Sequence, residues 1–349
     1  MKPPVDIHKT PDLLRRFEPP VLIVSTVVGR GMHSIGEAVR ERFPEKYKVC
    51  HIPIEEFLPE NAVNEDLKRY KIISDKFTAL LYLIYSVPFF YYRKYLREKF
   101  LNRASLKRLK AKIEALNAKT VICISHRPAF WVSSLKRKEK MRFNLWGVLG
   151  EYGRSLGWKY IFWEEVDGFL SSVDRHELDF DFPPRLEFIK TDLPVRQKFY
   201  DVSETKPDRN SVLLVCGFWG QGPLYETARS LLQKLPQLNI YIICGENKKQ
   251  YYRLKAYFKD NPNIKVYATV ETLAPFMKEC ASIITKPGIS TILEASAAQR
   301  KIFLLKGMPV AEDNNARYAI GNLSAEWFEI ERFKNWCIDS RETAGSCKQ

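Results

Sequence analysis

The segment from Ser282 to Tyr318 reads SIITKPGISTILEASAAQRKIFLLKGMPVAEDNNARY. Its apolar beginning predicts a buried strand that ends at Thr285, and its apolar spacing predicts a helix over Thr291–Gln299. The turn between the two is Lys-Pro-Gly, residues 286–288. Free backbone N–H groups at the start of such a helix attract an anion, and the helix dipole adds to the attraction. The alternative is an ordinary strand–turn–helix connection that a Ser or Thr side chain caps.

The residues around this turn suit a nucleoside diphosphate. Gly288 lets the backbone come close to a phosphate, and the hydroxyls of Ser290 and Thr291 can bond to it. Glu294 lies one helical turn further on, at a distance suited to ribose hydroxyls. We therefore predict that these four residues bind a nucleotide.

Strands and helices alternate strictly on both sides of this segment. The predicted strands are Ser211–Cys216, Ile240–Cys244, Ile264–Tyr267, Ser282–Thr285 and Lys301–Leu305. The predicted helices are Leu224–Leu235, Lys248–Lys259, Thr272–Cys280 and Thr291–Gln299. This alternation is typical of an α/β domain with a parallel sheet covered on both faces.

The N-terminal part of the chain begins in the same way. The β-branched run Val21–Val28 predicts a buried strand, residues 29–31 (Gly-Arg-Gly) a tight turn, and His33–Phe43 a helix. Further strands are predicted at Thr120–Ser125 and Lys159–Phe162. The chain is thus predicted to fold as two doubly wound, Rossmann-like domains, with ligands in a cleft that the carboxyl ends of both sheets face.

The polar stretch DVSETKPDRN, residues 201–210, has no apolar periodicity and is predicted to be a linker. It divides the chain into a first domain over residues 1–200 and a second domain over residues 211–349. A length of 349 residues with 45% apolar side chains supports two folded domains.

The net charge of +15 indicates a polyanionic partner, such as an anionic lipid surface, a phosphorylated substrate or nucleic acid, with solubility alone as the alternative. The seven cysteines have no CxxC spacing, which favours buried thiols of a cytosolic protein over disulfides or zinc. We expect neither a signal peptide nor a membrane-spanning helix, and a cytoplasmic protein.

The sequence TKPGISTILEASA resembles the TKPGGxTxxEAxA stretch of the diacylglycerol glycosyltransferases of glycosyltransferase family 28. Pro309, Glu312, Asn315 and Tyr318 stand where these enzymes have PGQExxNxxY. Three further segments are similar to the family's first glycine loop, its uracil-reading loop and its glycine–histidine turn. They contain Gly217 and Gly220, Val270 to Ala274, and Gly29 to His33, respectively.

The resemblance implies the GT-B fold, with a UDP-sugar donor in the second domain and a lipid acceptor in the first. It implies an inverting transfer without metal or cofactor. The donor-binding residues that it implies are Gly217, Gly220, Val270, Gly288, Ser290, Thr291, Glu294, Glu312 and Asn315.

The chain departs from the family pattern at four positions. Ile289 replaces the second glycine and Ala311 the glutamine, while Arg154 and Trp158 stand where the family has Asp and His. The one Asp-x-Asp pattern, residues 179–181, lies in a Pro-bounded loop far from the phosphate segment, so we interpret it as surface.

His33 is the candidate catalytic base, because a pKa near neutrality suits deprotonation of an acceptor hydroxyl. The alternative is that His33 caps the helix or binds phosphate without transferring a proton. His126, at the end of the next strand, and the pair Glu164 and Glu165 are weaker candidates.

The aromatic run FTALLYLIYSVPFFYY, residues 77–92, is followed by basic residues. Phe89, Phe90, Tyr91, Arg93 and Lys94 are predicted to contact an anionic membrane and the lipid acceptor. The alternative is a buried helix pair with a solvated basic face. We expect no nucleic-acid partner, because the sequence has no RNP-like, helix-turn-helix or zinc-finger pattern.

Two other functions remain open at this point. One is a GT-B glycosyltransferase that acts on a soluble acceptor. The other is a GT-B protein without catalytic activity that serves as a binding subunit, which the replaced Asp and His favour.

Overall fold

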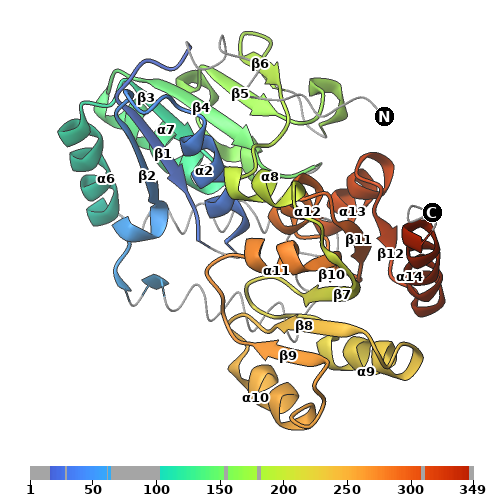
Figure 1. The fold of residues 1–349 in the computed structure, drawn as a ribbon. Helices are drawn as coiled ribbons and strands as arrows, with labels where there is room; N and C mark the ends of the chain where they lie inside the picture. Colours follow the sequence, from blue (N-terminus) through green and yellow to red (C-terminus); the bar gives the residue numbers. More distant parts are fainter. Residues whose placement is uncertain are drawn as a thin grey trace. The chain divides into compact units, whose positions relative to one another are not determined.

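The computed structural model of the protein describes residues 16–27, 30–60, 62–63, 103–152, 156–178, 182–307 and 311–345 (Figure 1). Contacts between residues divide the chain into two compact units. The first unit is Met1–Arg196 with Met308–Asn314, and the second is Gln197–Gly307 with Asn315–Gln349. Each unit is built on one six-stranded sheet.

The sheet of the first unit has the order β2-β1-β3-β4-β5-β6, and all its strands are parallel. The strands are β1 (Val21–Ser25), β2 (Val49–Pro53), β3 (Thr120–Cys123), β4 (Asn144–Leu149), β5 (Gly168–Ser171) and β6 (Glu187–Lys190). The described α-helices are α2 (Gly31–Glu41), α6 (Arg103–Leu116) and α7 (His126–Glu139). The 3-10 helices are η2 (Ile54–Phe57), η3 (Leu156–Tyr160), η4 (Trp163–Glu165) and η5 (Arg175–Glu177).

Both faces of this sheet are buried, as the run of apolar residues in β1 predicts. Leu22 and Val24 belong to the core cluster that includes Leu109 of α6 and Trp131 of α7. Ile23 is equally buried but points to the opposite face, because side chains alternate along a strand. Helix α2 contacts β1 and β2 there.

The sheet of the second unit has the order β12-β11-β10-β7-β8-β9 and is also parallel. Its strands are β7 (Asp208–Val215), β8 (Asn239–Ile243), β9 (Ile264–Tyr267), β10 (Cys280–Thr285), β11 (Lys301–Leu304) and β12 (Glu326–Trp327). The helices are α8 (Gln197–Ser203), α9 (Leu224–Lys234), α10 (Lys248–Tyr257), α11 (Ala274–Glu279), α12 (Ile289–Ala297) and α14 (Ile330–Gly345), together with α13 (Ala311–Asn322), whose residues up to Asn314 are assigned to the first unit.

Arg300 connects several elements of the second unit from a buried position. Its guanidinium donates to the carbonyl oxygens of Met277 (2.6 Å) and Val202 (2.9 Å) and to the hydroxyl of Thr205 (2.9 Å). Burial lowers the pKa of Arg300. The side chain therefore ties the end of α12 to α8 and α11.

The structure confirms every strand and helix predicted between Ser211 and Leu305, with shifted ends. The predicted strand Lys159–Phe162 is wrong, because this stretch contains the end of the 3-10 helix η3. The buried residues Trp158 and Ile161 are three apart, which is the spacing of a helical turn and not of a strand. The predicted linker, 201–210, is not irregular, since it contains the end of α8 and the start of β7.

Five of the six described cysteines are buried, and all six are free thiols, as the sequence predicts. In the part of the chain that the structure describes, no helix is both long enough and apolar enough to cross a bilayer.

Candidate active site

In the second sheet, the order in which successive strands are added reverses between β7 and β10. Strands β8 and β9 extend it on one side of β7, and β10 and β11 extend it on the other. Open parallel sheets bind ligands outside the carboxyl ends of the strands at such a point. The register pairs Val215 with both Thr285 and Ile243, so the loops after β7, β8 and β10 begin at one level along one edge.

Glycines fix the loops after β7 and β8 against each other. The backbone φ angles of Gly217, Gly220 and Gly245 are 70°, 59° and 57°. Residues other than glycine rarely adopt such values. A Cβ atom on Gly220 would lie 2.0 Å from the carbonyl oxygen of Cys244, so the two loops pack too closely for a side chain to fit between them. The predicted residues Gly217 and Gly220 thus shape a rigid edge of the sheet.

The loop after β9 joins this edge and contains the predicted residue Val270. The hydroxyl of Thr269 donates to the carboxylate of Glu246 (2.8 Å), and the N–H of Glu246 donates to the carbonyl of Phe218 (2.8 Å). Three successive loops are therefore connected by hydrogen bonds. Val270 is half-buried there.

Gly288 caps α12 without a side-chain hydrogen bond, and its φ is −71°. A Cβ atom added to Gly288 would meet no atom within 4 Å, so neither backbone geometry nor packing against the described residues requires glycine here. The first helical bond runs from the N–H of Ile292 to the carbonyl of Gly288 (3.1 Å). The N–H groups of Ile289, Ser290 and Thr291 therefore have no acceptor within the helix.

Three further predicted residues lie close to this turn in the chain or in space. The amide of Asn315 in α13 donates to the carbonyl of Pro287 (3.2 Å) and is buried. Glu312 is buried one turn earlier in α13, and Glu294 is buried in α12. The side chain of Lys286 covers Gly217, since a Cβ atom on that glycine would lie 2.8 Å from Lys286 Cε.

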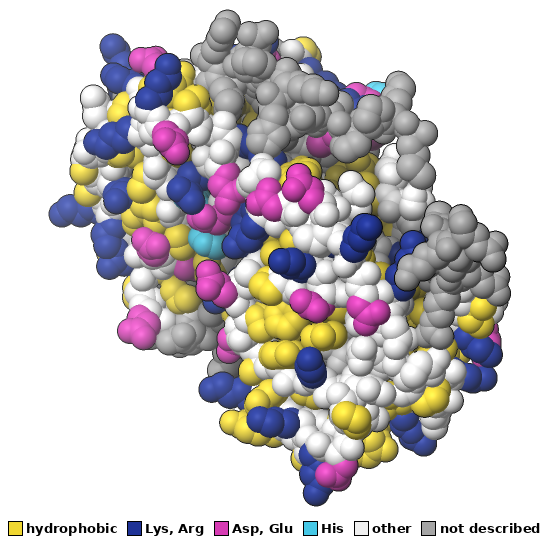
Figure 2. Space-filling view, in the orientation of Figure 1, with side chains coloured by type: hydrophobic (Ala, Val, Ile, Leu, Met, Phe, Trp, Pro, Cys, Tyr) yellow, Lys and Arg dark blue, Asp and Glu magenta, His cyan; other side chains and the backbone are white. Residues whose placement is uncertain are grey.

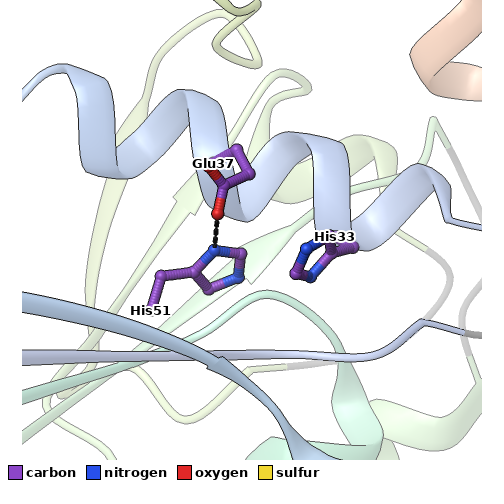
Figure 3. Close-up of side chains that lie close together, drawn as sticks. All are labelled: His33, Glu37 and His51. Carbon is purple, nitrogen blue, oxygen red and sulfur yellow. Dashed lines mark hydrogen bonds and ion pairs between the residues drawn. The ribbon is translucent and has the colours of Figure 1, made fainter. Parts of the chain in front are cut away.

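In the first unit, the strand order reverses at β1, because β2 is added on one side of it and β3 on the other. The predicted base His33 lies in the first turn of α2, directly after this strand. Figure 3 shows His33 and Glu37 on α2, with His51 opposite them on β2. The two imidazole rings are stacked with centroids 4.6 Å apart.

Hydrogen bonds connect these side chains through Ser25. The hydroxyl of Ser25 lies 3.1 Å from Nδ1 of His33 and 2.8 Å from Nε2 of His51. Nδ1 of His51 lies 2.5 Å from Oε1 of Glu37. Among the described residues, Nε2 of His33 has no hydrogen-bond partner.

Burial lowers the pKa of His33, and the neighbouring His51 lowers it further. Burial also lowers the pKa of His51, although Glu37 acts in the opposite direction. Burial by itself raises the pKa of Glu37, but the hydrogen bond with His51 and its charge bring that pKa below the usual value. At neutral pH the cluster therefore holds two neutral imidazoles and one carboxylate.

Ser25, Glu37 and His51 were not predicted from the sequence. The spacing of His33 and Glu37, four residues apart on a helix, was the available signal, because such residues share a helix face. His33, Glu37 and His51 also bring possible metal ligands within 4.8 Å of one another, as do Asp174, His176 and Glu177.

A second carboxylate, Glu55 of η2, is buried beside the chain that leaves β1. It accepts hydrogen bonds from the hydroxyl of Thr26 (2.5 Å) and the N–H of Val27 (3.1 Å). Arg127 lies 3.7 Å from it. Near the end of β4, burial raises the pKa of Glu151 to about 7, which makes it a titratable group that the sequence did not reveal.

The weaker base candidates are placed less favourably than His33. The ring of His126 packs against Gly157, where a Cβ atom would lie 2.3 Å from Cδ2. Glu164 is exposed and lies 3.9 Å from Arg137. Trp158, which stands where the family has His, is a core residue whose ring meets that of Phe169 at 5.0 Å.

Several predicted positions lie outside the described residues. They are Gly29, Phe89, Phe90, Tyr91, Arg93, Lys94, Arg154, Asp179 to Asp181 and Pro309. On the face drawn in Figure 2, Lys and Arg side chains are dispersed over the described surface among Asp and Glu.

Residues 211–327 match the glycosyltransferase family 28 C-terminal domain. Processive diacylglycerol beta-glucosyltransferases of Bacillus thuringiensis (strain Al Hakam) and Bacillus cereus (strain AH187) are each 26% identical to the chain over 320 residues. These alignments cover 86% of this chain and 79% of each relative.

Among solved structures, Acinetobacter baumannii MurG has a TM-score of 0.51 at 14% identity, over 92% of this chain and 90% of that chain. The glycotransferase of kitacinnamycin has a TM-score of 0.51 at 13% identity, over 89% and 86% of the two chains. Both share the fold of this chain. The matched domain, the relatives and the paired parallel sheets together show that the chain has the GT-B fold and is similar to the glycosyltransferases of family 28.

Proposed function

We propose that the protein transfers a hexose or N-acetylhexosamine from a UDP-sugar to a hydroxyl of a diacylglycerol-like lipid. The observation that carries the proposal is the start of α12, which has no side-chain cap and lies where the strand order of the second sheet reverses. The similarity to processive diacylglycerol beta-glucosyltransferases favours this class of acceptor.

In this proposal the diphosphate lies against the backbone N–H groups of Ile289, Ser290 and Thr291. These groups and the helix dipole attract negative charge, and the charge on the leaving diphosphate grows as the glycosidic bond to it breaks. Gly288 leaves the space above the turn open, and Lys286 adds a nearby positive charge. The site needs no cation to stabilise the leaving group.

The other donor residues have distinct roles in this proposal. The carboxylate of Glu294 binds the ribose hydroxyls, and the backbone near Val270 reads the uracil. Glu312 contacts the sugar or the diphosphate. Asn315 supports the turn through the carbonyl of Pro287, as its hydrogen bond indicates.

His33 is the proposed base. Its neutral imidazole takes the proton of the acceptor hydroxyl, and the acceptor oxygen then forms a bond to the anomeric carbon. The bond between that carbon and the diphosphate breaks with its electron pair moving to UDP, so the configuration inverts. The lowered pKa of His33 keeps the base unprotonated at neutral pH.

Transfer is measured with UDP-glucose, UDP-galactose and UDP-N-acetylglucosamine and with vesicles that contain diacylglycerol. We expect glycolipid from at least one donor, its loss in His33→Gln, and weaker UDP binding in Glu294→Gln. UDP binding without turnover of any donor would favour an inactive binding subunit. A Glu294→Gln variant that binds UDP as tightly as the native chain would contradict the ribose contact.

The acceptor class is tested separately from the donor site. The net charge of +15 and the aromatic and basic run that begins at residue 77 favour attachment to an anionic membrane surface. We expect the protein to float with vesicles of anionic phospholipid in a salt-sensitive manner. A chain that transfers sugar but stays in the dense fraction would act on a soluble acceptor.

A further inference from the structure

Glu37, His51, Ser25 and His33 form a continuous series of hydrogen bonds whose direction can be worked out. An ionised carboxylate only accepts hydrogen bonds, so Nδ1 of His51 carries the proton in its 2.5 Å contact with Glu37. A neutral His51 then has a bare Nε2, which accepts from the hydroxyl of Ser25 at 2.8 Å. The oxygen of Ser25 is left to accept from Nδ1 of His33 at 3.1 Å.

The last bond in the series determines the tautomer of His33. With its proton on Nδ1, neutral His33 has its lone pair on Nε2, the nitrogen for which the described residues offer no hydrogen-bond partner. We propose that Glu37, His51 and Ser25 are positioning residues that hold His33 in the tautomer able to act as a base through Nε2. This inference rests on the proposed role of His33 in glycosyl transfer.

The surroundings of the series support its rigidity. Ser25 is fully buried, and the side chain of His51 is 1% exposed. A Cβ atom on Gly36 would lie 2.4 Å from Nε2 of His51, so α2 packs directly on that ring. Because Ser25 ends β1 and His51 belongs to β2, the two strands hold the hydroxyl and the ring in register.

Other charged groups also act on the two imidazoles. Arg30 lowers the pKa of His33 and Glu55 raises it, while Arg40 lowers the pKa of His51. Glu37 raises the pKa of both rings. Glu37 forms a hydrogen bond with Nδ1 of His51, and this bond fixes the direction of the series.

His33, Glu37 and His51 could instead hold a transition-metal ion, because their possible ligand atoms lie within 4.8 Å of one another. The hydrogen bonds favour the proton series. Both nitrogens of His51 and Nδ1 of His33 already have partners at hydrogen-bond distance. A metal would have to displace these contacts.

The test reads the tautomers directly, by nitrogen-15 NMR of the full chain labelled at histidine. His33→Gln and His51→Gln assign the two rings among the five histidines. We expect Nδ1 protonated and Nε2 bare on both rings. In Ser25→Ala, His33 loses this preference while His51 keeps it, because the contact with Glu37 is unchanged. In Glu37→Gln the amide can donate as well as accept, so both rings show mixed tautomers.

Glu41→Gln is the matched control, because Glu41 lies on the exposed surface of the same helix. Native His33 with its proton on Nε2, no change in Ser25→Ala, or equal effects of Glu41→Gln and Glu37→Gln would each overturn the inference. Stoichiometric Zn²⁺ that shifts the nitrogens of both rings would also overturn it and would assign a metal site instead.

The kinetic arm uses UDP-glucose and diacylglycerol vesicles. We expect Ser25→Ala to lower kcat by roughly 10-fold to 100-fold, which is at or below the lower end of what general-base catalysis contributes, with KM for UDP-glucose unchanged. Glu37→Gln moves the acid limb of kcat/KM to lower pH, because the charge of Glu37 raises the pKa of His33. A native enzyme that shows the expected tautomers but no transfer would refute the proposed function and leave the hydrogen-bond series intact.

Discussion

Replacement of Gly288 separates the donor site from the stability of the fold. Because φ at Gly288 is −71° and a Cβ atom there would meet nothing within 4 Å, a side chain can start at this position without backbone strain or a Cβ clash with the described residues, and we expect Gly288→Leu to fold. Replacing a glycine at the N-cap position with an apolar residue lowers the free energy of unfolding by about 0.5–1 kcal/mol. For a unit of this size that is a decrease of roughly 1–4 °C in Tm.

The effect on UDP binding is expected to be much larger. The leucine side chain fills the open space above the turn and keeps the diphosphate from the N–H groups of α12. Hydrogen bonds to charged groups contribute about 1.5–3 kcal/mol each, so loss of two of them weakens binding by at least about 3 kcal/mol, or roughly 100-fold in Kd. Gly288→Ala gives a smaller loss in the same direction.

Calorimetric titration with UDP and thermal unfolding of the same samples measure both quantities. Gly321→Leu is the matched control, because a Cβ atom on this glycine of α13 also meets nothing within 4 Å. We expect it to bind UDP like the native chain. A folded Gly288→Leu variant with a Kd within about threefold of native would refute the diphosphate site at this helix.

The other predictions concern the scaffold, the histidines and the membrane. Gly220→Ala would place a Cβ atom 2.0 Å from Cys244 O at a φ of 59°. We therefore expect chemical unfolding to show a decrease of at least about 2 kcal/mol in the free energy of unfolding. An unchanged unfolding midpoint would mean that the loops after β7 and β8 can shift to make room. Arg300→Leu leaves three acceptors without their donor, and we expect a loss of about 2–4 kcal/mol that Arg300→Lys restores only in part. The pKa values of His33 and His51 lie below 6.5, so the unfolded chain takes up protons first as the pH falls. Their contribution to stability is present above pH 6.5 and is lost as the pH falls below it. Tm measured from pH 7.5 to about pH 5.5 should therefore fall less in His51→Gln than in the native chain, and an equal fall in both would contradict this reasoning. Finally, charge reversal of Arg93 and Lys94 should reduce flotation with anionic vesicles without changing UDP affinity; unchanged flotation would remove this segment from the membrane contact.

Much of the second unit could be predicted because its sequence repeats one pattern. Short β-branched runs alternate with amphipathic helices from Ser211 to Leu305, and each strand ends in glycine or polar residues. That pattern alone predicts a parallel sheet and places the Lys286–Gly288 turn at its carboxyl edge. The turn chemistry then predicts an anion site, since only the start of a helix offers several free N–H groups together.

The first unit was harder to predict because its strands are short or carry atypical residues. Strand β2 contains Pro53 and a histidine, and β5 has only four residues. The apolar stretch KYIF, residues 159–162, suggested a strand where the chain forms the end of a 3-10 helix. Tertiary packing against Phe169 decides that segment, and a single sequence does not contain that information.

The histidine cluster shows the same limit at the level of the site. His33 was predicted from its place after a strand, but its partners come from three separate elements. Ser25 and His51 meet only because β1 and β2 pair in parallel, with Ile23 opposite His51. Nothing in the local sequence of β2 marks His51 as a partner of α2.

The contact between Gly220 and the carbonyl of Cys244 also has an evolutionary consequence. A larger residue at Gly220 or Gly245 would clash with the backbone of the other loop, so both positions are closed to variation while the two loops keep this packing. Substitutions that alter the choice of donor sugar must then fall outside these two glycines. Ile289, which replaces a family glycine next to the proposed diphosphate, is itself buried, so a change there would also disturb the packing of α12.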